Sequence, residues 1–148
     1  QMVRHMVRSL TAIVSSGRKV ILVYPVPEMG WEVPVQLSKI YRRKGAVSAR
    51  DGSTLYSVFL ARNRRTIAAL DSIKGDNVIR VRPDRILCDS FVKERCAAHL
   101  NGEPLYVDDD HLSNLGAMLV AREIMKHMQP TVAQANAGLG PATATPSL

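Results

Sequence analysis

Long apolar runs are absent from this sequence. The longest, residues 20–26, is interrupted by Pro25 and falls well short of the roughly 18–20 residues that a membrane-spanning helix needs. The first residues lead directly into an amphipathic pattern, so we do not expect a signal peptide there. The 148 residues are enough for one domain with a hydrophobic core. A start at Gln1 rather than at a methionine suggests a piece of a longer protein.

Aromatic residues are also scarce: the chain has two Phe, four Tyr and one Trp. This number is too small for the stacking surfaces with which single-strand binders hold bases. The net charge is +7, but the basic residues are dispersed along the chain, and neither zinc-finger spacing nor an RNP-like motif is present. We therefore expect solvated basic faces and no nucleic-acid partner. A non-catalytic carbohydrate- or anion-binding module and a basic nucleic-acid binder stay open as alternatives.

Cysteine is limited to one pair, Cys88 and Cys96. A structural zinc site normally takes four Cys or His ligands, so this pair is too small for one. Two interpretations remain at this point. The pair can form a short-loop disulfide, which implies an oxidising compartment, or it can be two buried thiols of a cytosolic protein.

The apolar periodicity alternates between helical and strand-like spacing. It predicts helices over residues 3–14, 34–41, 54–73 and 114–127, and strands over residues 19–24 and 77–81. The first strand is expected to be buried on both faces, as in a parallel sheet, with a ligand-binding loop at its carboxyl end. Asn101-Gly102 predicts a hairpin turn. The order indicates a layered α/β domain over residues 1–128, followed by a disordered tail over residues 129–148. Two strands make only part of a sheet.

The candidate catalytic or cation-binding residues lie in the run Asp108-Asp109-Asp110-His111. In this run a strand-like segment turns into a helix that is capped by Ser113. An Asp three residues before a His can accept a hydrogen bond from the ring Nδ1. That bond fixes the tautomer and leaves Nε2 to take a proton from a serine hydroxyl. Two other interpretations of the spacing stay open. The group can bind a cation, or it can be an acidic turn that stabilises the N-terminus of the following helix.

Three segments carry a resemblance to a known family. They are residues 19–30, residues 83–88 with Cys96, and residues 102–117, which include the Tyr-Val-Asp-Asp-Asp-His-Leu-Ser run. The last two segments resemble the C-terminal block of SGNH domains fused to acyltransferase-3 membrane proteins, which O-acetylate lipopolysaccharide and other cell-surface glycans. The first is similar to an upstream strand and loop of the same domains. The resemblance implies a three-layer α/β/α fold with a mainly parallel sheet, flavodoxin-like, present here as a partial domain.

Carried over to this chain, the resemblance assigns the catalytic Asp to Asp108 and the general base to His111. It implies that Cys88 and Cys96 are disulfide-linked and that the domain lies at the periplasmic face of the inner membrane. The implied partners are a carbohydrate acceptor, an acyl donor and a fused membrane acyltransferase domain, with no metal or diffusible cofactor. The family's Gly-Asp-Ser nucleophile block and its oxyanion-hole Gly and Asn have no counterpart here. Without them the chain alone is expected to be inactive.

Three further residues could lie near this site. Trp31 follows the loop after the first strand and can be a lid on the core or a wall of an acceptor-sugar pocket. Glu28 in the same loop could face the site. His99 is expected to lie on a face of the hairpin rather than in a site.

Overall fold

The computed structural model describes residues 2–128, and the predicted tail, residues 129–148, lies outside the described residues. Helix α1 (Met2–Ser15) packs part of its apolar stripe against the core, with Val14 buried and Leu10 partly buried. Gly17 follows the end of this helix and has a positive φ of 79°. Val3 and Ile13, which the periodicity placed on the buried face, are 40% and 44% exposed.

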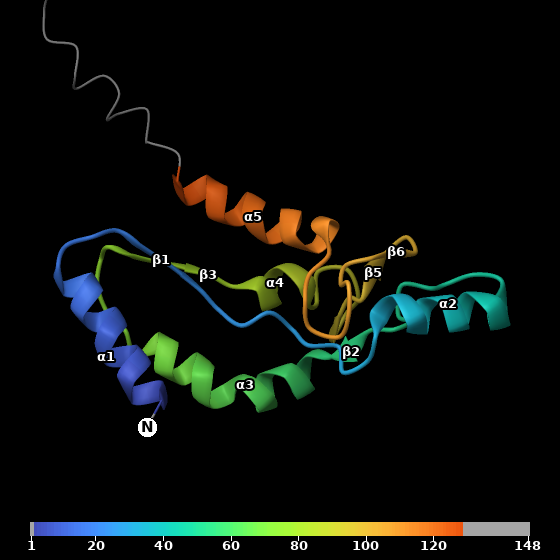
Figure 1. Ribbon diagram of the computed structural model, residues 1–148, viewed down its shortest axis with the longest axis horizontal. Helices are drawn as coiled ribbons and strands as arrows, with labels where there is room; N and C mark the ends of the chain where they lie inside the picture. The colour runs from blue at the N-terminus through green and yellow to red at the C-terminus, as the bar shows by residue number, and fades with distance from the viewer. Residues whose placement is uncertain (1, 129–148) are drawn as a thin grey trace, which may run out of the picture.

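The first strand, β1 (Val20–Val23), pairs in parallel with β3 (Val78–Val81), with Val20 opposite Val78. Helices α1 and α3 lie on one side of this pair and α5 on the other (Figure 1). The predicted burial of β1 on both faces is wrong, because Val23 is 42% exposed. Within residues 2–128, β1 has one strand partner, β3, so no strand lies along its other edge.

The remaining helices differ from the predicted ranges: α2 is longer than predicted, α3 is shorter, and α5 is longer by one residue. Helix α2 (Val33–Lys44) begins with Pro34 in its first turn and ends at Gly45, which takes the left-handed conformation with a φ of 73°. Helix α3 (Tyr56–Asp71) follows the two-residue strand β2 (Thr54–Leu55). Helix α4 (Pro83–Leu87) was not predicted; Pro83 begins it, as a proline can in the first turn. Helix α5 (Asn114–Met128) begins after Ser113.

The hairpin forms around the predicted turn, with two residues in each strand. Strand β5 (His99–Leu100) pairs antiparallel with β6 (Glu103–Pro104). Asn101 and Gly102 both have positive φ, 52° and 90°, as a two-residue hairpin loop of the primed type requires. Strand β4 (Arg95–Cys96) pairs with β2.

The α/β class is confirmed, but a three-layer domain with a broad parallel sheet is not established. The described residues form three separate two-stranded sheets, of which only β1–β3 is parallel. None of the helices in residues 2–128 is long and apolar enough to cross a membrane.

Candidate active site

The Asp–His run forms a closed turn between β6 and α5. Tyr106 and Leu112 make an antiparallel bridge, and the Val107 N–H donates to the His111 carbonyl at 2.9 Å. Beneath the turn, Leu105 and Tyr106 are fully buried. The turn thus stands on the core while its tip, residues 108–111, projects toward solvent.

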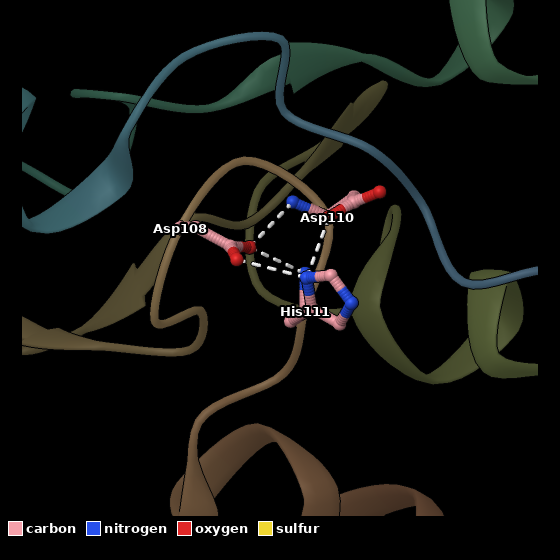
Figure 2. Close-up of side chains that lie close together, drawn as sticks. All are labelled: Asp108, Asp110 and His111. Carbon is pink, nitrogen blue, oxygen red and sulfur yellow. Dashed lines mark hydrogen bonds and ion pairs between the residues drawn. The ribbon is translucent and has the colours of Figure 1, made fainter.

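Within the turn, Asp108 organises both the backbone and the imidazole. Its Oδ1 accepts hydrogen bonds from the N–H groups of His111, at 2.7 Å, and Asp110, at 3.0 Å. Its Oδ2 lies 2.8 Å from Nδ1 of His111. Figure 2 shows the ring with its second nitrogen directed away from both drawn carboxylates. The arrangement fixes one tautomer and leaves Nε2 available to a reacting group.

The neighbouring carboxylates are less well placed to orient the ring. An oxygen of Asp110 also lies 2.8 Å from Nδ1, and Figure 2 marks this ion pair, but the hydrogen bond of that nitrogen is made with Asp108. Asp109 contributes its backbone carbonyl to a contact with the Met29 N–H instead. Of the three carboxylates, the geometry therefore favours Asp108 as the partner of His111.

The same contacts shift the pKa values of Asp108 and His111. The backbone N–H groups of His111 and Asp110 lower the pKa of the Asp108 carboxyl below its usual value. The hydrogen bond from Asp108 raises the pKa of the His111 imidazole, and the charges of Asp108 and Asp110 act in the same direction. The His111 side chain is 74% exposed, so water screens these charges. The pair thus stabilises an imidazolium, as a general base requires after it has taken a proton.

The turn is held against the loop that follows β1. The Met29 N–H donates to the Asp109 carbonyl at 2.7 Å, and the Val33 N–H donates to the Asp108 carbonyl at 3.2 Å. Met29 and Val33 are both buried. The loop at the carboxyl end of the parallel strand, predicted to be the ligand-binding end, therefore contacts the candidate catalytic residues through backbone hydrogen bonds.

A buried ionic network, which was not predicted from the sequence, lies near the ends of β1 and β3. Asp84, which is fully buried, accepts two hydrogen bonds from Arg82, both at 2.8 Å, and one from the Tyr56 hydroxyl at 2.7 Å. Arg82 lies over the ring of Tyr24, 4.8 Å from its centroid. Burial and the Asp84 hydrogen bond raise the pKa of Tyr56 to about 12. The network joins α3, α4 and the end of β1; the signal for it was the Pro83-Asp84 step directly after a strand.

The two cysteines are linked by a disulfide, Cys88–Cys96, and both are buried. The bond joins the end of α4 to β4, and the Ala97 N–H donates to the Leu87 carbonyl beside it at 2.9 Å. Both cysteines belong to the same apolar cluster as Leu105 and Tyr106. This result resolves the alternatives left by the sequence in favour of the disulfide and ties the bond to the base of the site.

The other candidate residues lie outside the Asp–His pair. Glu28 forms an ion pair with Arg62 of α3 at 2.7 Å. The Trp31 indole N–H donates to the Gly52 carbonyl at 3.0 Å, which fastens the loop after β1 to the loop after α2. His99 is buried in the hairpin, where Nδ1 accepts from the Gly102 N–H and Nε2 lies 3.0 Å from the Ser48 carbonyl. His99 thus lies on the hairpin, where the sequence placed it.

The cation alternative has a geometric basis but no further support. One ligand atom from each of Asp108, Asp110 and His111 lies within 4.8 Å of the others. The Nδ1 hydrogen bond with Asp108 would have to break before that nitrogen bound a metal. Exposed acidic groups commonly form such clusters without an ion.

Close packing at the start of α5 supports the turn and leads to a stability prediction. A Cβ at Gly116 would collide with the backbone carbonyl of Leu105 and would also lie 3.0 Å from Leu112. Helix propensity alone predicts that Gly116→Ala stabilises the protein. We expect the opposite, a loss of roughly 1–3 kcal/mol in the free energy of unfolding, because the backbone must shift. Urea unfolding followed by circular dichroism measures it.

Met118→Ala is the matched control, since Met118 is 49% exposed on the same helix. Its effect should stay within about 0.5 kcal/mol. A Gly116→Ala protein as stable as the wild type would show that α5 does not pack against Leu105 as described.

Comparison with known proteins gives one match. The family model of the SGNH domain fused to AT3 domains matches residues 1–126. No curated protein and no solved structure gave a significant match. The match spans both the strand–loop segment that holds the turn and the Asp–His turn itself. The chain therefore belongs to the family of SGNH domains fused to AT3 domains.

Proposed function

We propose that this chain forms the histidine-containing part of an O-acyltransferase or esterase active site that acts on carbohydrate hydroxyls of cell-surface glycans. The family supports an acyl-transfer or esterase-type activity and a fused acyltransferase domain. The observation that carries the proposal is the Asp108–His111 hydrogen bond at 2.8 Å, on a turn held at the carboxyl end of β1.

In this mechanism His111 removes a proton from a serine hydroxyl, and the serine oxygen attacks the acyl carbonyl. His111 then returns the proton to the departing group. In the second half, the sugar hydroxyl or water gives its proton to His111 and attacks the acyl-serine. The bond between the acyl carbon and the serine oxygen then breaks, and His111 returns the proton to that oxygen. Asp108 keeps Nδ1 protonated throughout and stabilises the imidazolium. We place the serine and the oxyanion donors in sequence preceding Gln1, and the domain on the periplasmic face of the inner membrane.

The proposal is tested by comparing two lengths of the protein. The protein extended upstream of Gln1 should hydrolyse a small acetyl ester, p-nitrophenyl acetate, faster than buffer does. Residues 1–148 alone should give no rate above buffer, because nucleophile and oxyanion donors are both needed. Equal rates for the two lengths would refute the assignment of the serine to upstream sequence. Absence of hydrolysis by the folded, extended protein would refute the esterase activity.

The net charge of +7 favours a second candidate, a non-catalytic carbohydrate- or anion-binding module. It predicts binding that survives His111→Ala and weakens as salt is added. Retained binding combined with absent ester hydrolysis in the extended protein would favour this module.

A further inference from the structure

A groove lies between α2 and the β5–β6 hairpin, which run side by side in Figure 1. Its volume is about 740 Å³. Tyr41 and Arg42 line it from α2, Asn101 and Gly102 line it from the hairpin loop, and Leu37 contributes apolar surface. The groove thus combines an aromatic ring, a guanidinium group and a side-chain amide within one concave surface.

This groove continues toward the candidate active site. A second hollow, of about 440 Å³, shares Pro34 and Pro104 with the first. Val107 and Ser113, which flank the Asp–His turn on both sides, also line the second hollow. The two hollows therefore adjoin each other at these prolines, one beside the turn and the other beside α2. A chain whose end reacts at the turn can lie across both.

The lining indicates the chemistry of such a chain. The Tyr41 side chain is 60% exposed, so its ring offers an uncovered face on which an apolar face of a sugar can stack. Among the residues that line the larger hollow, Arg42 is the only charged one. Within residues 2–128, its guanidinium makes no ion pair. One planar guanidinium can pair with one carboxylate through two parallel hydrogen bonds.

We propose that this groove is an acceptor subsite for an oligosaccharide that carries carboxylate groups, with Tyr41 stacking on one sugar ring and Arg42 pairing with a carboxylate. The proposal rests on the proposed function, because it names the acceptor class for the same site. Tyr41 and Arg42 are binding residues away from the reacting atoms.

The test is a calorimetric titration of the purified extended protein with hexagalacturonate, with the neutral maltohexaose as the comparison ligand. Hexagalacturonate should bind and maltohexaose should bind at least roughly tenfold more weakly, since it lacks the charge for Arg42. Tyr41→Ala and Arg42→Gln should each weaken hexagalacturonate binding roughly tenfold. Tyr41→Phe keeps the ring and should retain the affinity.

Arg65→Gln is the charge-matched control, because Arg65 is exposed on α3, outside the groove. It should change the dissociation constant by less than about twofold. Equal weakening by Arg65→Gln and Arg42→Gln would overturn the proposal in favour of diffuse charge attraction. Absence of hexagalacturonate binding, or equal binding of the two sugars, would overturn it as well. If the expected binding results are obtained but ester hydrolysis survives His111→Ala, the binding role of the groove is supported and the proposed function is refuted.

Discussion

Replacement of His111 by alanine should reduce kcat for p-nitrophenyl acetate in the extended protein by at least about a thousandfold. The imidazole is the group that moves the proton in both halves of the mechanism. Its Nδ1 is occupied by Asp108, and its Nε2 points away from the carboxylates (Figure 2). Alanine leaves no group in the turn that can replace Nε2 as a base near neutral pH. The measurement is steady-state kinetics on protein that circular dichroism shows to be folded.

His5→Ala is the control for this result, because His5 is an exposed histidine on α1. It should retain the wild-type rate. Full activity in His111→Ala would exclude His111 as the general base, and equal losses in both variants would indicate a general effect on the fold.

Asp108→Asn should cost roughly a thousandfold or more in kcat. The asparagine Oδ1 can still accept the N–H groups of Asp110 and His111, so the turn should keep its shape. Its amide would face Nδ1 of His111 in place of the carboxylate oxygen and would favour the wrong tautomer. Asp109→Asn and Asp110→Asn are the matched controls, and each should stay within about tenfold of the wild type. A larger loss in Asp110→Asn than in Asp108→Asn would show that Asp110 orients the ring.

Asp108→Asn should also change the pH dependence of activity, and the contact between Asp108 and His111 gives the direction of the change. Asp108 raises the pKa of His111, and a base must be neutral to act. Activity should therefore rise with pH through this raised pKa. With Asp108 replaced by Asn, the imidazolium loses its main stabilising partner and its pKa falls. The acid limb of kcat/KM should then move to lower pH while the plateau drops. An unmoved limb would show that Asp108 does not set the ionisation of the catalytic group.

The Asp–His pair could be predicted because its geometry is local. A carboxylate three residues before a histidine reaches the ring within one turn, whatever the rest of the chain does. The Asn101-Gly102 hairpin and the Ser113 cap were predictable for the same reason. The Ser113 Oγ accepts from the Gly116 N–H at 3.3 Å, and both hairpin residues have positive φ.

The tertiary contacts of the site could not be predicted in this way. The hydrogen bonds from Met29 to Asp109 and from Val33 to Asp108 join segments far apart in sequence, and backbone donors leave no residue signature. The exposure of Val23 depends on what packs over that face of β1, which apolar content does not reveal. The Arg82–Asp84 network depends on burial of a charged residue, which is rare, so the Pro83-Asp84 step after a strand was too weak a signal to predict it.

The most direct test of the central claim is the reaction of the extended protein with a serine-directed fluorophosphonate, followed by peptide mass spectrometry. The mechanism predicts one adduct, on a serine upstream of Gln1, and a labelling rate at least about a hundredfold lower in His111→Ala, because the serine is then no longer activated. An adduct on a serine within residues 1–148, or labelling at the wild-type rate in His111→Ala, would contradict the assignment of His111 as the base that activates an upstream serine.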